Sequence, residues 1–174
     1  MSCSLADQIT AFYLPDRLKS QRLKRIQSGP NRVEDGIPKF WGRQGPRHAT
    51  VHEFSHSFVN PLTDEYAARV DSCASLFAPI EEKMKRTAYG QWATCVNEHI
   101  VCAVTSRFVY RFDGPENGDK QLKAEEDDGF VYIAPLVNAL ERFESDSTDY
   151  PTFADFYPEL LGVLESQSPV SGEK

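Results

Sequence analysis

Residues 91–112 read QWATCVNEHIVCAVTSRFVYRF, the longest stretch of the chain with helical patterning. Apolar side chains recur along it every four residues, at Trp92, Val96, Ile100, Val104 and Phe108. This spacing approximates one stripe of an α-helix, so residues 91–112 are predicted to form a single long helix. Most of the remaining chain shows helical spacing too. We therefore expect a mainly α fold, α+β at most, with little or no sheet.

Further helices are expected on both sides of this segment. They are predicted at 16–27, 47–59, 64–77, 79–88, 130–144 and 152–164. Pro61 is expected to end the second of these, because a proline disfavours the α conformation in the residue before it. Residues 113–129, DGPENGDKQLKAEEDDG, are polar and contain three glycines and a proline. They are predicted to form a surface loop.

The chain divides into one main domain and two flanking segments. Prolines and glycines crowd residues 28–46, which are expected to be irregular with at most a short extended piece at 37–41. We therefore expect an N-terminal helix and irregular segment at 1–46 and a catalytic domain at 47–164. The polar residues 165–174 are expected to form a flexible tail.

Composition excludes several classes of protein. The 174 residues carry a net charge of -7, which argues against a nucleic-acid binder with a basic face. No apolar run approaches the roughly 18 residues of a membrane span. No signal peptide is recognisable, so we expect a cytoplasmic protein as written, or a secreted or periplasmic one if the N-terminus is truncated. The four cysteines contain no CxxC pair and do not suggest a disulfide framework.

Residues 51–58, VHEFSHSF, contain an HExxH motif inside a predicted helix. His52 and His56 lie one turn apart on one face, so both imidazoles can reach one metal ion. Glu53 projects beside that ion, where it can take a proton from a coordinated water. The alternative is an ordinary amphipathic helix, but only four histidines occur in the chain and chance makes such a motif rare. The motif predicts a site for one Zn²⁺ ion.

A zinc site of this kind needs a third protein ligand, and five residues compete. They are His48, Asp64, Glu65, Glu98 and His99. His48 fails because three consecutive turns of a straight helix cannot surround one tetrahedral ion. Asp64 and Glu65 resemble first-turn acids that complement a helix dipole. Glu98 is best placed, because small or weakly polar residues surround it on its helix face. A histidine such as His99 is more often packed or hydrogen-bonded than metal-bound.

Three segments carry a resemblance to a known family. They are HEFSHSFVNPL at 52–62, AYGQWATCVNEHIVCAV at 88–104 and YPTFADFYPELL at 150–161. The motif followed by an Asn-Glu pair on a second helix resembles the gluzincin zinc metallopeptidases. More closely, the segments resemble the bacterial domain-of-unknown-function family 4932, whose members are regarded as metallopeptidases. The resemblance covers about residues 47–164.

This resemblance implies a zincin-like domain in which the HExxH helix packs on a glutamate-bearing helix. It implies that His52, His56 and Glu98 bind the zinc ion and that Glu53 is the general base. The implied activity is hydrolysis of a peptide or protein substrate through a zinc-activated water. Tyr89 is our first candidate for stabilising the oxyanion. Tyr132, His99 and Arg107 are the alternatives.

Two departures from the family favour a second hypothesis. Cys102 stands where family members commonly carry an arginine, and the chain starts only about 50 residues before the motif. Gluzincins place an edge strand beside the cleft, for which only residues 36–42, GIPKFWG, are present upstream. The alternative is a catalytically inactive zinc-binding or helical interaction module derived from such a peptidase.

Overall fold

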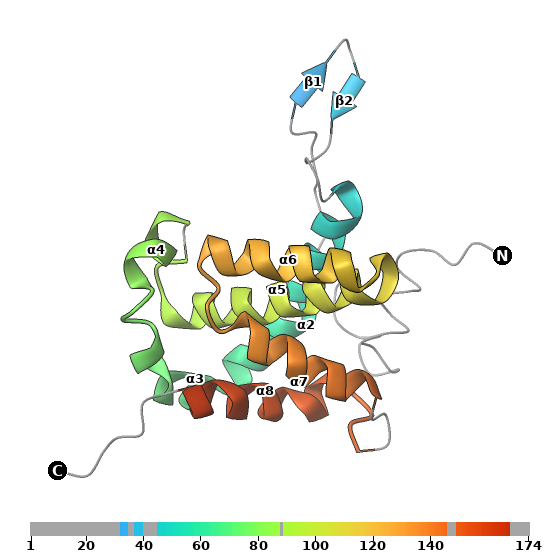
Figure 1. Ribbon diagram of the computed structural model, residues 1–174. Coiled ribbons are helices and arrows are strands. Elements are labelled where there is room, and N and C mark those ends of the chain that lie inside the picture. The colour runs from blue at the N-terminus through green and yellow to red at the C-terminus, as the bar shows by residue number, and fades with distance from the viewer. Residues whose placement is uncertain (1–31, 35–36, 40–44, 88, 146–148, 168–174) are drawn as a thin grey trace.

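The computed structural model describes residues 32–34, 37–39, 45–87, 89–145 and 149–167, and it is mainly helical (Figure 1). This confirms the predicted α class. The predicted helix at 16–27 lies outside the described residues. The elements are β1 (Arg32–Glu34), β2 (Ile37–Lys39), α2 (Gly45–Glu65), α3 (Ala67–Ser72), the 3-10 helix η2 (Ala74–Leu76), α4 (Glu81–Arg86), α5 (Trp92–Asp113), α6 (Pro115–Asp128), α7 (Ile133–Ser145) and α8 (Phe153–Gln167).

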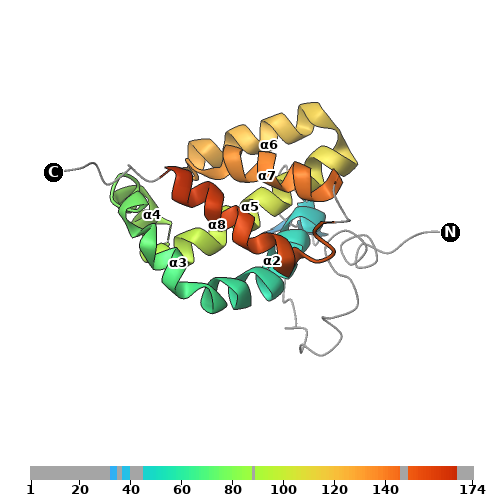
Figure 2. The same cartoon turned by 90° about the horizontal axis from the view of Figure 1, so that it is seen from below.

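Helix α5 runs through the middle of the helical body, as Figures 1 and 2 show from two directions. It contacts α2, α6 and α7, and nearly every residue from Cys95 to Phe108 is buried. A helix that other helices surround in this way needs apolar side chains on most of its faces, which the sequence supplies. The prediction of one long helix at 91–112 is confirmed. Glu98 therefore lies in the core, where it is 7% exposed.

Helix α2 continues through Pro61, so the prediction that the proline ends the helix is wrong. Proline removes one backbone donor, but the next turn is held by the packing of its buried face. Thr63 is buried there, and its hydroxyl oxygen lies 3.3 Å from the Val59 carbonyl oxygen. Asp64 and Glu65 consequently lie at the exposed end of α2 and do not begin the next helix. The predicted helix 64–77 is instead the end of α2 followed by α3 and η2.

The polar segment 113–129 is also a helix, α6, and the prediction of a loop is wrong. Pro115 occupies the first turn, where its missing N–H costs nothing, and Gly129 ends the helix in the left-handed conformation with φ +112°. Gly118 packs against Tyr110 of α5, with no room for a Cβ atom. The glycines and the proline that suggested a loop are thus the cap residues and the contact residue of a helix.

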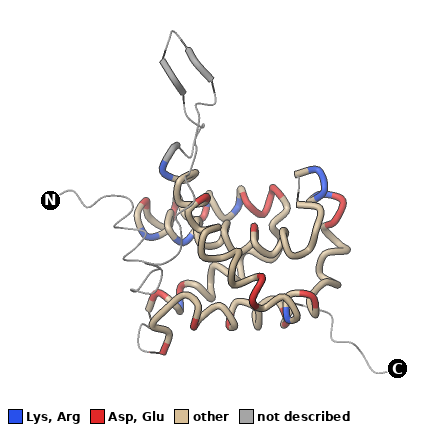
Figure 3. Tube along the Cα trace, turned by 180° about the vertical axis from the view of Figure 1, so that it is seen from behind, with Lys and Arg blue, Asp and Glu red and all other residues tan. Residues whose placement is uncertain are grey.

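Helices α7 and α8 complete the body and agree with the predicted segments 130–144 and 152–164. Arg107 of α5 donates two hydrogen bonds to Glu144 of α7, at 2.9 and 2.7 Å. The indole of Trp92 donates to the Val70 carbonyl at 2.7 Å and joins α5 to α3. Acidic and basic residues are interspersed along the helices (Figure 3).

Strands β1 and β2 pair as an antiparallel hairpin, with Arg32 opposite Lys39 and Glu34 opposite Ile37. Figure 1 shows the hairpin beyond the start of α2. It contains part of the predicted extended piece at 37–41. Cys73, Cys95 and Cys102 are free thiols. Among the described residues, no helix combines the length and the apolar character that a membrane span requires.

Candidate metal centre

Three side chains from two helices converge between α2 and α5. His52 and His56 stand one turn apart on α2, and Glu98 extends toward them from α5. The two histidine Nε2 atoms lie 3.3 Å apart. The Nε2 atom of His52 lies 3.4 Å from Glu98 Oε2, and that of His56 lies 3.3 Å from Glu98 Oε1. This group could hold a metal ion.

The three separations match a tetrahedral ion. Zinc binds imidazole nitrogen at about 2.0–2.1 Å and carboxylate oxygen at about 2.0–2.2 Å. Two corners of a tetrahedron of that radius are about 3.3–3.5 Å apart. The two histidines, and each histidine with the Glu98 oxygen that faces it, therefore stand in pairs at the spacing of two neighbouring coordination positions, a different oxygen of Glu98 facing each ring.

A buried hydrogen-bond network fixes how α2 and α5 lie against each other. The Thr63 hydroxyl of α2 donates to Asn97 Oδ1 of α5 at 2.5 Å. The Tyr157 hydroxyl of α8 lies 2.6 Å from the same Thr63 oxygen and can donate to it. Asn97 immediately precedes Glu98. The network therefore positions the carboxylate relative to the histidines.

A further contact orients His56. Its Nδ1 atom lies 3.1 Å from Oδ1 of Asn60, one turn farther along α2. When Nδ1 carries the proton and donates it to Asn60, the lone pair of Nε2 points toward the other two donors. A ligand histidine commonly has such a partner, which sets its tautomer and ring orientation. Sequence reasoning missed Asn60, although its spacing from His56 is that of the motif itself.

The electrostatics of the group favour a cation. Oε2 of Glu98 is buried and accepts no hydrogen bond within the described part of the chain. Burial lowers the pKa of His52, but the neighbouring Glu98, Glu53 and Glu125 carboxylates outweigh it and raise that pKa above its ordinary value. A buried carboxylate oxygen without a donor costs free energy. A metal ion would satisfy it.

Comparison with known proteins identifies the family. Residues 45–163 match the model of the family described as Domain of unknown function (DUF4932). The chain belongs to this family. No curated protein and no solved structure matches it significantly. All the residues of the metal-binding group lie within the DUF4932 domain.

The structure places two other predicted residues of the DUF4932 domain around this group. Glu53 is exposed and follows His52 directly, and its carboxylate is close enough to help raise the pKa of His52. Tyr89 is half-buried just before α5. Burial and the nearby Glu98 carboxylate raise the pKa of Tyr89 to about 12. Tyr89 thus keeps its proton at neutral pH and lies within electrostatic reach of Glu98.

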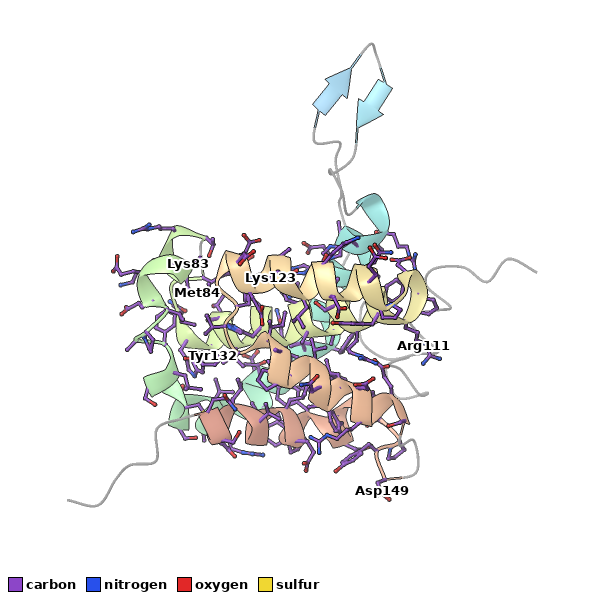
Figure 4. The ribbon with its side chains drawn as sticks, in the orientation of Figure 1. Lys83, Met84, Arg111, Lys123, Tyr132 and Asp149 are labelled. Atoms are coloured by element: carbon purple, nitrogen blue, oxygen red, sulfur yellow. The ribbon has the colours of Figure 1, made fainter. Side chains whose placement is uncertain are left out.

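The other residues predicted as oxyanion-stabilising candidates form contacts outside the metal-binding group. His99 is buried, with its Nδ1 donating to the Cys95 carbonyl at 2.8 Å and its ring packed between Phe130 and Tyr132. The Tyr132 hydroxyl donates to the Leu76 carbonyl at 2.8 Å, beside α4 (Figure 4). The guanidinium of Arg107 donates to the Glu144 carboxylate.

Three other predicted ligand candidates also lie outside the group. His48 lies one turn before His52, and burial, together with the His52 charge, lowers its pKa to about 4. Asp64 is exposed, as is its neighbour Glu65.

Glu125 of α6 is a buried acid near the group that sequence reasoning missed. It is 8% exposed, and Gln121 donates to its Oε1 at 2.5 Å. It also accepts a hydrogen bond from the thiol of Cys102, whose pKa burial raises well above its ordinary value. The segment that carries Glu125 is polar and was predicted to be a loop, so no sequence pattern indicated a buried acid there.

A cavity of about 930 Å³ is bordered by α2, α5 and α6, and His52, His56 and Glu98 are not among the residues that line it. His48 lines it one turn from His52, and Gln121 lines it next to Glu125. Arg47, which also lines the cavity, stacks over the ring of Phe108, 4.6 Å from its centre. The cavity is therefore separate from the metal-binding group, and His48 is the lining residue one helical turn from it.

Proposed function

We propose that this DUF4932 domain is a zinc-dependent metallopeptidase of the zincin-like type. The observation that carries the proposal is the convergence of His52, His56 and Glu98, whose facing donor atoms lie 3.3–3.4 Å apart in pairs, with the exposed Glu53 next to His52 in the same helix. Two histidines one turn apart on a helix, with a glutamate directly after the first of them, are typical of hydrolases that activate water with zinc. The nitrogen and oxygen donors also suit zinc.

In the proposed hydrolysis, the bound metal and each neighbouring residue have separate roles. Bound zinc supplies a Lewis acid that lowers the pKa of a coordinated water to about 7. Glu53 accepts the proton of that water and delivers it to the leaving amine. Tyr89, still protonated with a pKa of about 12, donates a hydrogen bond to the developing oxyanion.

The test separates metal binding from catalysis. Purified wild type should contain one zinc per chain and hydrolyse an unstructured protein such as casein. Glu53→Gln should keep the zinc but lose hydrolysis by at least about 100-fold, the usual scale of general-base catalysis. Glu65→Gln removes an exposed acid from the same helix and should behave as wild type. A wild type that binds zinc but cleaves nothing in a broad peptide library would contradict the peptidase proposal.

A second candidate is a non-catalytic metal-binding module. In the described part of the chain the group is built from helices, and the paired strands β1 and β2 lie beyond the start of α2 (Figure 1). A strand beside the cleft, which would hold the peptide backbone, is not seen among these residues. This candidate predicts stoichiometric zinc without hydrolysis. A helical interaction module without metal predicts no zinc at all.

A further inference from the structure

We propose that Tyr157 of α8 is a positioning residue of the metal centre, which holds the Glu98 carboxylate in place through two hydrogen bonds. The bonds pass through the hydroxyl of Thr63 in α2 to the side chain of Asn97, the neighbour of Glu98 in α5. The inference rests on the metal centre of the proposed function. It goes beyond the ligands and the general base, because it makes metal affinity depend on a third helix that lies outside the metal-binding group.

The protons of this network have one consistent arrangement. The Thr63 hydroxyl has a single proton, and its oxygen lies 2.5 Å from Asn97 Oδ1 but 3.3 Å from the Val59 carbonyl oxygen. The proton therefore goes to Asn97, whose amide oxygen can only accept. The Tyr157 hydroxyl lies 2.6 Å from the same Thr63 oxygen and must then donate to it. Thr63 thus donates one hydrogen bond and accepts another.

The two hydroxyls lie where an unmade hydrogen bond is costly. Thr63 is 2% exposed, and Tyr157 is fully buried. The Tyr157 ring packs against Tyr66 and Phe153, with ring centres 5.7 and 6.2 Å away. Valine and phenylalanine would fill the same space without polar atoms. The hydroxyls therefore add a specific alignment of three helices, which buried and fully paired polar groups supply.

Asn97 and Glu98 are adjacent on α5 but contact α2 at two separate points. Glu98 faces His56 at 3.3 Å, whereas Asn97 meets Thr63, which lies seven residues and about 10 Å farther along α2. The two side chains also point about 100° apart around the axis of α5. A rotation of α5, or a shift along α2, that broke the Thr63 contact would therefore move Glu98 relative to the histidines. Because ligand groups need positions held to within about 0.5 Å, this contact bears on metal affinity.

Metal affinity of the folded protein provides the test, and no substrate is needed. Zinc dissociation constants are measured by competition with a chromophoric chelator, and the visible spectrum of the cobalt-substituted protein reports the ligand geometry. Tyr157→Phe keeps the packed ring and removes its hydroxyl. We expect it to weaken zinc binding by about 5-fold, the scale of one net hydrogen bond. Thr63→Val keeps the branched shape but breaks both bonds, and should weaken binding by about 10- to 100-fold and change the cobalt spectrum.

Three further variants separate positioning from general loosening of the core. Thr63→Ser keeps the hydroxyl and should retain most of the affinity. Thr105→Val also removes a buried hydroxyl, but one that donates to the Val101 carbonyl of its own helix at 2.8 Å, and it should match wild type. In the double variant carrying Thr63→Val and Tyr157→Phe, the loss should equal that of Thr63→Val alone, because Tyr157 acts only through Thr63. Urea unfolding with chelator present identifies conditions in which every variant is folded, and affinities are compared there.

Three results would overturn the assignment. One is a folded Tyr157→Phe protein whose zinc affinity stays within about twofold of wild type. The second is a loss in Thr63→Ser or Thr105→Val as large as that in Thr63→Val, because the hydroxyl between the helices would then not be the cause. The third is additive losses in the double variant.

Hydrolysis plays no part in these readouts, so failure of the peptidase proposal is distinguishable from failure of this one. A wild type that binds no zinc would overturn both.

Discussion

The Nε2 atom of His56 lies 3.3 Å from Oε1 of Glu98, and this contact joins α2 to the central helix α5. Without a metal ion, a buried carboxylate faces two imidazoles. A metal ion bound by all three residues would connect the two helices. Metal binding should therefore be coupled to folding, because the unfolded chain does not hold the three donors at this spacing.

This coupling predicts opposite effects of Glu98→Gln in the two states of the protein. In the presence of a chelator the variant should be as stable as wild type or more so, because a buried charge is removed. Zinc at 100 times its dissociation constant should add about 2.7 kcal/mol to the unfolding free energy of wild type and close to nothing to that of the variant. Urea unfolding with and without zinc measures both. An equal gain from zinc in the two proteins would exclude Glu98 as a ligand.

Asn60→Ala should weaken zinc binding without removing a ligand. The change deletes the 3.1 Å partner of His56 Nδ1, so the imidazole is free to rotate and to adopt the other tautomer. Loss of such a partner typically costs 10- to 100-fold in metal affinity, roughly. Asn60→Asp keeps an acceptor in place and should retain the affinity. Asn117→Ala removes an exposed asparagine of α6 and serves as the control. Chelator competition measures all four proteins, and an unchanged constant for Asn60→Ala would contradict the orienting role.

The metal-binding group was largely predictable from sequence because its spacing follows helix geometry. His52 and His56 share a face by virtue of the motif alone. The sequence also placed Glu98 on a second long helix, but only tertiary packing brings that helix to the first. Thr63, Asn97 and Tyr157 set this packing, and they are far apart in the sequence. No local pattern links them.

The prediction from sequence was wrong for α6, where polar residues form the buried face of a helix. Helix α6 buries Gly118, Gln121 and Glu125 instead of an apolar stripe, so hydrophobic periodicity could not reveal it. Its ends are set by Pro115 and Gly129, which also occur in loops. Because α6 was expected to be a loop, the buried acid it carries was missed as well. The wrong prediction for α6 and the omission of Glu125 thus have the same cause, which is that the buried face of this helix is polar.

Acid should destabilise the metal-free protein through His99. Burial lowers the pKa of this histidine to about 4, against about 6.5 in the unfolded chain. Between these values the unfolded chain binds a proton that the folded protein excludes, so the unfolding free energy falls as the pH falls from about 6.5 to 4, by at most about 3 kcal/mol. Urea unfolding at a series of pH values with chelator present measures the slope. His99→Phe should flatten that slope by about one proton, whatever its effect on stability at pH 7. An unchanged slope would show that His99 is not the group responsible.

Two glycine-to-alanine substitutions should have opposite effects. Gly118 of α6 packs so closely on Tyr110 that a Cβ atom would lie 2.3 Å from its ring, and the ring must move to admit a methyl group. Gly118→Ala should therefore lower the unfolding free energy by about 1–3 kcal/mol, as overpacking does. Gly162 of α8 has no atom within 4 Å of such a Cβ, so Gly162→Ala gains helix propensity and should raise the unfolding free energy by about 0.5–1 kcal/mol. Urea unfolding of both variants with chelator present measures the contrast. If Gly118→Ala proved as stable as Gly162→Ala, the close packing of α6 on α5, and with it the burial of Glu125 beside the metal-binding group, would be wrong.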